Sequence, residues 1–524
     1  MKPVRLLLCS LVGILVLLLL VGCERPDPAV VIVVTPLAPL TLPPTPLVTP
    51  FADPASAPPT PGLAEPAAAM ERPLPTYAGI PTPDPPHQTV AGDAQPYLTH
   101  YVNPGETLGY IAQLYGSSID ELQTVNQLAN SDWVQVGQQI LIPSQASLVS
   151  PDFKIIPDSE LVYGPAAADF AVRTVAAFWG GYLLTYGEQV EGQWLAGPEI
   201  VSLVAHRYSV NPRLLLAVLE YRSGWVTQTA VAEELYPLGY ARPRAEGLYT
   251  QLGWAANLLN WGYYGRAEAG ITSFLIGEEL RVAFAPTINH GTAGVQTFFG
   301  ATSGVTYESW QRDVGPDGLL ATFGRLFGSP FAYTVDPLWP PTLAQPALQL
   351  PWSSDETWYF TGGPHGGWAS GSAWAALDFV PAGNQLGCVQ SDAWVLAMAD
   401  GVVTRSDFGA VVVDLDGDGY AGTGWAITYM HLESRDRIPV GAFVQTGDRL
   451  GHPSCEGGFS NGTHVHVART YNGRWVSADG LIPFVMGGWV SQGLGREYDG
   501  LLVRGGVSKE ACECREEINA IPGQ

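Results

Sequence analysis

Three stretches of this 524-residue chain differ in the spacing of their apolar residues. In the first patterned stretch, residues 98–145, an apolar strand at each end encloses two segments with helical spacing. Leu108 and Ile111 belong to the first segment, and Ile119 and Leu122 begin the second. This order predicts a small βααβ module.

The second patterned stretch, residues 155–335, carries long segments with apolar residues three and four positions apart. Several of these segments have proline at or near their first position, where a helix tolerates it. The predicted helices are 166–183, 198–208, 212–221, 249–263 and 291–299. We therefore expect an all-α domain here.

The third patterned stretch, residues 352–490, alternates apolar and polar residues or runs through β-branched and aromatic ones, with turn signals between the runs. The predicted strands are 394–398, 401–406, 410–415 and 425–431. These short strands predict an antiparallel β-sheet. Because side chains alternate along a strand, Ile427, Tyr429 and His431 should share one face.

Two proline-rich segments separate the patterned stretches. Residues 24–97 hold twenty of the forty-four prolines and show no period, and residues 336–351 form a shorter, stiffer boundary. The long segment cannot bury enough apolar surface to offset chain entropy, so it should act as an extended spacer. The chain is therefore multidomain, with residues 491–524 left as a C-terminal tail.

Residues 1–23 have a basic start, then an apolar run, then Leu20-Val21-Gly22-Cys23. This pattern resembles a bacterial lipoprotein signal, which is cleaved before the cysteine that receives the lipid. The resemblance implies that Cys23 is the lipid-bearing N-terminus of an exported protein anchored to the membrane at the cell envelope. An uncleaved membrane helix is the alternative, although the run is short for a span of ~20 residues.

The net charge of −24, with no cluster of Lys or Arg to offset it, argues against a nucleic-acid partner. Abundant Trp, Tyr and Gly instead suit contacts with carbohydrate or cell wall.

Five of the nine histidines lie between residues 351 and 490. His464 and His466 are two residues apart in a valine-flanked segment, so a strand would put both imidazoles on one face and Val465 on the other. His365 and Asp378 add a nitrogen and an oxygen from a Gly-rich loop. Three such side chains can hold a zinc ion and leave its fourth tetrahedral position to water, as in catalytic zinc sites.

The motifs His365-x12-Asp378, Tyr-Met-His431-Leu and His464-x-His466, in this order, resemble the lysostaphin-type zinc endopeptidases of bacterial cell walls, and the long first gap resembles the staphylolysin branch. The resemblance implies that His365, Asp378 and His466 bind the zinc ion. It makes His431 and His464 the unligated catalytic histidines. The chain has no His-Glu-x-x-His helix, so these two imidazoles must handle the protons.

This resemblance implies an endopeptidase that cuts the peptide cross-links of peptidoglycan. A noncatalytic wall-binding scaffold, or an activator of other wall hydrolases, is the alternative. The sequence leaves open which peptide bond would be cleaved, because the substrate groove depends on loop shapes.

The βααβ module resembles a LysM domain through Tyr101-Val102, Gly105-Glu106-Thr107-Leu108 and Ile140-Leu141-Ile142-Pro143, among other positions. The resemblance implies binding of glycans that contain N-acetylglucosamine. We expect the contacts from the loop formed by Gly105, Glu106, Thr107 and Leu108, and from the loop before Ile140.

Residues 211–225 of the helical stretch resemble the catalytic helix of lysozyme-like lytic transglycosylases. Where those enzymes have their acid glutamate, this chain has Arg222, which cannot protonate a glycosidic oxygen. Glu220 lies about 200° away round a helix. We therefore expect a noncatalytic lysozyme-like glycan holder. A helical spacer with an aromatic core carries equal weight, and a glycosidase that uses Glu220 is the third choice.

Asp414-Leu415-Asp416-Gly417-Asp418-Gly419 matches the start of a calcium loop, but the twelfth position is Trp425 where an EF-hand has glutamate. An ordinary hairpin turn is the preferred interpretation.

Four cysteines remain besides Cys9 and Cys23, which allows three pairings. We expect Cys388 to pair with Cys455, because that bond ties the loop after Asp378 to the segment before His464. A bond between Cys512 and Cys514 should be strained.

Overall fold

The computed structural model describes residues 97–102, 106–115, 117–128, 134–143, 148–277, 280–383 and 386–523. The predictions for the signal sequence, for Cys23 and for the spacer to residue 96 lie outside these residues, as does Gly105. All described residues belong to one structural unit, Met70–Gln524. Within the described ranges, no helix is both long enough and apolar enough to cross a membrane.

The first module has the predicted βααβ order. Its elements are β1 (Tyr97–Tyr101), α2 (Leu108–Leu114), α3 (Ile119–Asn126) and β2 (Gln139–Pro143). β1 and β2 are antiparallel, with His100 opposite Ile140. α3 begins after Ser118, whose hydroxyl accepts a hydrogen bond from the Glu121 N–H and so caps the helix.

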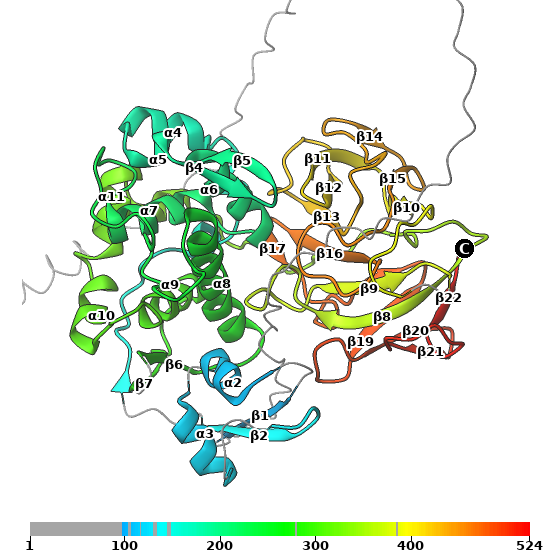
Figure 1. The fold of residues 1–524 in the computed structure, drawn as a ribbon, viewed down its shortest axis with the longest axis horizontal. Coiled ribbons are helices and arrows are strands. Elements are labelled where there is room, and N and C mark those ends of the chain that lie inside the picture. Colours follow the sequence, from blue (N-terminus) through cyan, green and yellow to red (C-terminus); the bar gives the residue numbers. More distant parts are fainter. Residues whose placement is uncertain are drawn as a thin grey trace, which may run out of the picture. The chain divides into compact units, whose positions relative to one another are not determined.

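The second domain has a helix within each of the five predicted ranges, as Figure 1 shows, although the range 166–183 is interrupted at Gly180 and Gly181. These helices are α4 (Val172–Trp179), α6 (Gly197–Tyr208), α7 (Pro212–Ser223), α8 (Leu248–Ala267) and α9 (His290–Gly300). The remaining helices are α5 (Tyr182–Thr185), α10 (Tyr307–Asp313) and α11 (Leu319–Phe327), with short 3-10 turns η1 (Asp158–Glu160), η2 (Pro165–Ala167) and η3 (Pro330–Tyr333).

The prediction of an all-α domain is wrong, because five short strands accompany these helices. They are β3 (Leu148–Val149), β4 (Gly187–Val190), β5 (Gln193–Ala196), β6 (Ser273–Ile276) and β7 (Leu280–Ala283). β4 and β5 are joined through Glu191 and Gly192 alone, at φ 48° and 83°. A two-residue hairpin turn of this kind needs positive φ at both positions. Strands of two to four residues are too short to show an alternating pattern in the sequence.

The third domain is built on an antiparallel sheet, as predicted. The strand order is β14-β11-β12-β13-β16-β9-β8-β22, and β17 pairs with β16. These strands are β8 (Thr357–His365), β9 (Ala376–Val380), β11 (Gly401–Asp407), β12 (Ala410–Asp414), β13 (Trp425–Met430), β14 (Phe443–Val444), β16 (Val465–Tyr471), β17 (Arg474–Trp475) and β22 (Ala520–Pro522). β10 (Val395–Leu396) pairs separately with β15 (Arg449–Gly451).

The prediction of a C-terminal tail at 491–524 is wrong. β18 (Val485–Met486), β19 (Trp489–Gly493), β20 (Gly500–Arg504) and β21 (Val507–Glu510) form a four-stranded sheet. β22 then joins the edge of the main sheet beside β8. The segment is polar, but the buried Asn519 side chain donates hydrogen bonds to the carbonyls of Phe360, Cys512 and Cys514 and so fixes the backbone.

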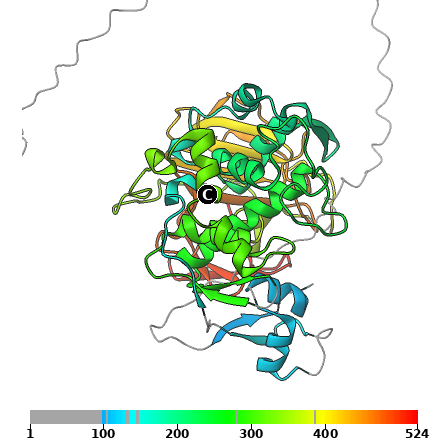
Figure 2. The ribbon, with the colours of Figure 1, turned by 90° about the vertical axis from the view of Figure 1, so that its left-hand side faces the viewer.

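The helical domain packs directly against the sheet domain, and Figure 2 shows the helices in front of the sheet. The guanidinium of Arg207 lies 4.9 Å from the centroid of the Trp368 ring and 5.2 Å from that of Phe408. The Tyr264 hydroxyl accepts a hydrogen bond from the Trp475 N–H. One buried apolar cluster continues across this boundary to include Trp368 and Trp475.

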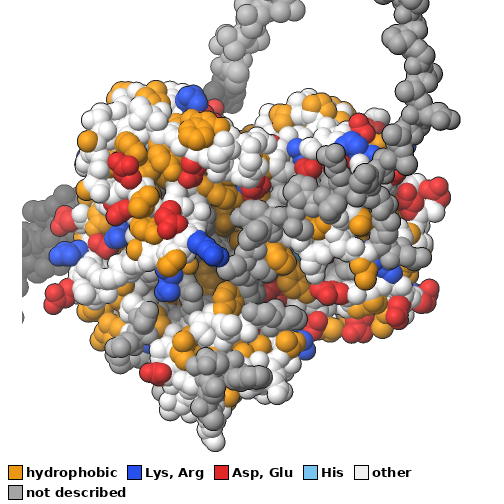
Figure 3. All heavy atoms as spheres, viewed as in Figure 1, with side chains coloured by type: hydrophobic (Ala, Val, Ile, Leu, Met, Phe, Trp, Pro, Cys, Tyr) orange, Lys and Arg blue, Asp and Glu red, His pale blue; other side chains and the backbone are white. Residues whose placement is uncertain are grey.

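The net charge of −24 reflects an excess of acidic over basic side chains. On the face drawn in Figure 3, basic side chains are few and lie scattered among acidic and apolar ones.

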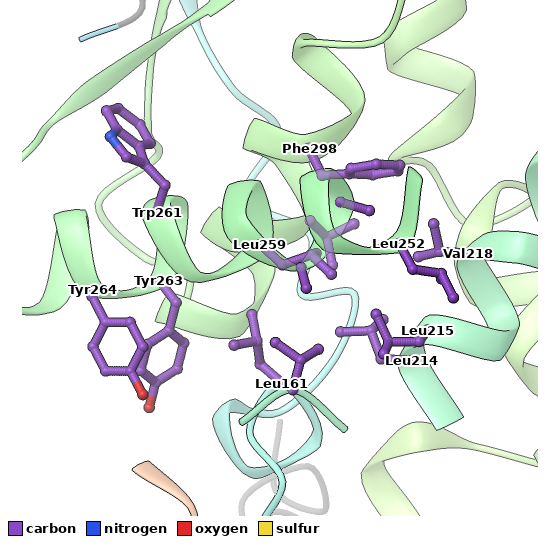
Figure 4. Packing of buried hydrophobic residues seen from close by; sticks show 14 of the residues in the cluster. Leu161, Leu214, Leu215, Val218, Leu252, Leu259, Trp261, Tyr263, Tyr264 and Phe298 are labelled. Atoms are coloured by element: carbon purple, nitrogen blue, oxygen red, sulfur yellow. The ribbon is translucent and has the colours of Figure 1, made fainter. Parts of the chain in front are cut away.

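The core of the helical domain depends on close contact between α8 and α9. Leu252, Leu259 and Phe298 of these helices are fully buried, together with Leu161 and the apolar face of α7 (Figure 4). A Cβ on Gly262 would lie 2.5 Å from Thr297 Oγ1, and a Cβ on Gly294 would lie 2.5 Å from the Leu259 carbonyl. Glycine is therefore required at both positions for the helices to approach.

Glu220, near the end of α7, has a structural place in this domain. Its buried carboxylate accepts hydrogen bonds from the N–H groups of Val226 and Thr227 and from the Thr227 hydroxyl, at 2.6 to 3.0 Å. Arg325 of α11 lies 3.0 Å from it. The carboxylate thus ties α7 to the loop that follows it and to α11.

We expect Glu220→Ala to lower the free energy of unfolding by roughly 2 to 3 kcal/mol, because it leaves buried N–H groups without an acceptor. Glu199→Ala is the matched control, since it removes the exposed ion pair with Arg173, which should contribute less than about 1 kcal/mol. Calorimetric melting of both full-length variants measures the difference. Equal stability of the two variants would contradict the structural role of Glu220.

Candidate metal centre

Three neighbouring strands bring the predicted metal ligands together. Asp378 of β9 lies directly opposite His466 of β16 in the antiparallel register. His365 is the last residue of β8, and the pairing of β8 with β9 shifts between Gly362 and His365. Such a bulge re-aims a side chain at the end of a strand, and here the imidazole meets the other two ligands.

The three ligand atoms form a small triangle. His365 Nε2 lies 3.0 Å from His466 Nδ1 and 3.2 Å from Asp378 Oδ1, and His466 Nδ1 lies 3.3 Å from Asp378 Oδ1. Two atoms bound to one tetrahedral zinc ion at ~2.0 Å are roughly 3.3 Å apart. Asp378 Oδ1 is also buried and has no hydrogen-bond partner. The triangle therefore fits one face of a tetrahedral metal site, and the orphaned oxygen needs a cation.

A backbone carbonyl orients each of the four histidines of the centre. The carbonyl pairs with the ring nitrogen that faces away from the centre. The pairs are His365 Nδ1 with Gly363 at 2.8 Å, His466 Nε2 with Gly367 at 3.1 Å, His431 Nδ1 with Glu456 at 2.9 Å and His464 Nδ1 with Gly462 at 2.7 Å. Because a carbonyl can only accept, the proton of each neutral ring resides on that nitrogen. The opposite nitrogen keeps its lone pair for a metal or a proton.

His431 and His464 lie beside the triangle. Their ring centroids are 4.3 Å apart, and His464 Nε2 lies 3.7 Å from Asp378 Oδ1. His464 and His466 thus point to the same side, as their spacing predicts, while Val465 is buried in the apolar core.

The prediction that His431 shares a face with Ile427 and Tyr429 is wrong. Those two side chains enter the apolar core on the far side of the sheet from His466. The strand ends at Met430, and His431 adopts φ 62°, which turns the chain out of the strand and brings its ring to the metal centre.

Burial and neighbouring charges shift the pKa values of the residues in the centre. Burial and the nearby His464 and His466 hold the pKa of His431 well below its usual value, and burial lowers the pKa of His466. Burial alone would raise the pKa of Asp378, but the charges of His365 and His464 bring it well below the usual range. Burial opposes protonation of His365, whereas Asp378 raises its pKa. The carboxylate is therefore ionised and His431 is neutral at neutral pH.

Tyr498 is a neighbour of the centre that the sequence analysis missed. Its ring stacks on His365 with 4.3 Å between centroids. Its carbonyl accepts a hydrogen bond from the Gly363 N–H, and its own N–H donates to Pro364. Tyr498 belongs to the connection between β19 and β20, a region read as a tail, so no local pattern could reveal it.

The structure pairs Cys388 with Cys455, with 5.7 Å between their Cα atoms. Thr463 joins the same two loops, because its N–H donates to Gly387 and its hydroxyl accepts from the Val389 N–H. Cys512 and Cys514 are also paired.

Two side chains of the predicted glycan loop are buried, so contacts at these residues would come from their backbone groups and stay a prediction. Leu108 is fully buried in the core of the module. The Glu106 carboxylate is buried against His100, 2.7 Å from Nε2. Neither side chain can reach a ligand. Thr107 is exposed and stays a prediction, although its hydroxyl accepts a hydrogen bond from the Tyr110 N–H.

Comparisons with known proteins agree with this architecture. Residues 100–143 match the LysM domain family, and residues 154–340, expected to be lysozyme-like, match the family of LasA N-terminal domains. Protease LasA of Pseudomonas aeruginosa, strain UCBPP-PA14, is 28% identical over 295 residues, which is 52% of this chain and 66% of that protein. The chain thus spans just under two thirds of the length of this curated relative.

Two solved structures are similar to part of this chain. The M23 metalloprotease pseudoalterin, from the deep sea, is 30% identical over 32% of this chain and 96% of that protein, with a TM-score of 0.28. The catalytic domain of the antimicrobial peptidase lysostaphin from Staphylococcus simulans is 21% identical over 24% of this chain and 88% of that domain, with a TM-score of 0.17.

The identity to pseudoalterin extends over nearly the whole of that protein, and it confirms the relationship that the histidine motifs indicated. The chain belongs to the M23 metalloproteases and carries a LysM domain and a LasA-type N-terminal domain ahead of its protease domain.

Proposed function

We propose that this chain is a zinc endopeptidase that hydrolyses the peptide cross-links of bacterial peptidoglycan. The observation that carries the proposal is the triangle of His365 Nε2, Asp378 Oδ1 and His466 Nδ1, with the imidazoles of His431 and His464 beside it. The similarity of the chain to Protease LasA and to the antimicrobial peptidase lysostaphin supports peptidoglycan as the substrate class.

His365, Asp378 and His466 would hold the zinc ion. When bound there, zinc supplies Lewis acidity, which lowers the pKa of water toward ~7 and polarises a peptide carbonyl. Among the described residues, the group that could hold the ion comprises His365, Asp378 and His466, which would leave a further position to water and substrate.

His431 serves as the proton acceptor in this proposal. It is neutral, and its Nε2 is free to take a proton from the attacking water because Nδ1–H already donates to the Glu456 carbonyl. That hydrogen bond persists when the ring becomes protonated and stabilises the charge. His464 lies on the same side. Because its Nδ1–H donates to the Gly462 carbonyl, its Nε2 can accept a proton and, once protonated, can donate to the developing oxyanion or pass that proton to the leaving amine.

The other domains hold the enzyme on its substrate. The LysM domain binds glycan that contains N-acetylglucosamine, and the lipid on Cys23 fixes the chain to the membrane outside the cytoplasm. The LasA-type domain is noncatalytic, in keeping with the structural hydrogen bonds of Glu220.

Digestion of purified cell walls with different cross-bridges tests this function. We expect the zinc-loaded protein to release fragments whose new ends, read by mass spectrometry, lie within the peptide cross-links and not in the glycan strands. A zinc-loaded protein that cuts none of these walls would support the noncatalytic scaffold instead.

His466→Ala should remove zinc and activity together, because it deletes one of three protein ligands. His464→Ala should retain near-stoichiometric zinc and lose roughly 10² to 10⁴ in turnover, the usual scale for a positioned acid-base group. Asp378→Ala should behave like His466→Ala, and His431→Ala like His464→Ala. Zinc content by mass spectrometry beside cleavage rates separates the two classes.

His452→Ala is the control for loss of a buried histidine, because His452 packs on Trp394 away from the ligand triangle. It should keep its zinc. A metal-free His464→Ala, or an active His466→Ala, would show that the ligand assignment does not hold.

Cys23→Ala should release the protein from the membrane without loss of peptidase activity in vitro, because the lipid site is separate from the metal centre. Fractionation of membranes measures the change. Unmodified protein that fractionates as freely soluble would contradict the anchor.

A further inference from the structure

The loop between β12 and β13 lies at the opposite end of these strands from the histidine centre. Ala410 pairs with Met430 at the end next to His431, whereas Asp414 pairs with Ala426 at the other end. The loop begins with Asp414, Asp416 and Asp418, and one carboxylate oxygen from each lies within 4.8 Å of the others.

Asp414 distinguishes this loop from an ordinary acidic turn. Asp416 and Asp418 are exposed and accept short-range hydrogen bonds, as in many hairpins. Asp414 is fully buried; one of its oxygens accepts from the Gly419 N–H, and the other, Oδ1, has no hydrogen-bond partner. A hairpin turn does not require a buried carboxylate oxygen without a partner. Burial of such an oxygen lowers the stability of the fold unless a cation pairs with it.

The charges of the three carboxylates also favour a bound cation. Three like charges at this separation repel one another, and a cation bound between them would relieve that repulsion.

We propose that Asp414, Asp416 and Asp418 form a calcium site. The site offers only oxygen ligands, which hard cations prefer, whereas zinc takes nitrogen and sulfur more readily. Calcium accepts several carboxylates in an irregular arrangement, while magnesium keeps most of its waters and uses one or two. The two exposed carboxylates leave the outer side open to the waters that complete the coordination.

The site departs from an EF-hand at Trp425, which cannot supply the bidentate carboxylate of the twelfth position. We therefore place its affinity in the weak range of extracellular calcium modules, with Kd on the order of 10⁻⁴ to 10⁻³ M.

The loop also contacts the helical domain. The Tyr420 hydroxyl donates to the Gly164 carbonyl at 3.0 Å, and its ring packs on Tyr163 with 5.2 Å between centroids. At the end of the loop, the Gly424 N–H donates to Asn472, which in turn donates to the Leu338 carbonyl. Calcium that fixes this loop therefore stabilises the docking of the helical domain on the protease domain.

Calcium titration of the full-length, zinc-loaded protein by calorimetry tests the site. We expect one site in the stated range, weakened at least tenfold by Asp416→Asn, whose exposed side chain can be changed without disturbing the core. Asp317→Asn, an exposed aspartate of the helical domain, is the matched control and should bind as the parent does. Terbium should give luminescence sensitised by Trp425 in the parent and not in Asp416→Asn.

The same titration on His466→Ala separates this site from the zinc centre, because calcium binding should persist there. Zinc content of the parent should not change on addition of calcium. The proposal is overturned by absence of binding up to 10 mM calcium, by binding that Asp416→Asn leaves intact, or by binding that disappears in a folded His466→Ala.

The effect of calcium on the docking of the helical domain is measured separately. Calcium at 5 mM should raise the melting temperature by a few degrees and slow hydrogen exchange at residues 162–164 and 420–424, in the parent and in Asp317→Asn but not in Asp416→Asn. Calcium binding with unchanged exchange at residues 162–164 would overturn the link to docking.

Discussion

The antiparallel register of β9 and β16 is the constraint on which the metal centre depends. It places Asp378 opposite His466, and the neighbouring strand β8 ends at His365. A slip of one residue would exchange the two faces of the sheet and put Val465 where His466 must be. The buried Val465 and Val467 on the other face therefore hold the register as well as filling the core.

The helical domain supports this centre through the loop between His365 and Asp378. The carbonyl of Gly367 orients His466, and the next residue, Trp368, lies under the guanidinium of Arg207. Arg207 is itself held by the carboxylate of Glu191 and the hydroxyl of Tyr249.

A second contact reaches the same loop from α8. The side chain of Asn257 donates to the Ser370 hydroxyl and accepts from the Gly371 N–H. Glycine has wide backbone freedom, so these contacts from another domain add to the hydrogen bonds inside the loop, such as that from the Trp368 N–H to the Ser372 hydroxyl. The orientation of a metal-site histidine thus depends on residues more than a hundred positions away in another domain.

The sequence predicted what depends on local periodicity and on side-chain chemistry. The helices around Leu252 and Leu215 follow from helical spacing, and the sheet follows from short alternating runs. The ligand set follows from the resemblance of the histidine motifs to a known family of zinc endopeptidases. The prediction failed where geometry is set by single backbone angles or distant contacts. His431 reaches the centre through one left-handed residue, and Tyr498 through a hairpin that has no alternating pattern.

The strand pair β12–β13 connects two sites of different chemistry. The end at His431 adjoins a cluster of nitrogen ligands with one carboxylate, and the end at Asp414 offers oxygen ligands alone. Since ligand type sorts metal ions more reliably than affinity does, one sheet can hold two different cations without exchange between them. A chelator that removes both ions would therefore have two effects at once. It would abolish peptide hydrolysis at the histidines, and it would loosen the loop that Tyr420 anchors to the helical domain. Variants that alter one ligand set at a time are the means to separate these effects.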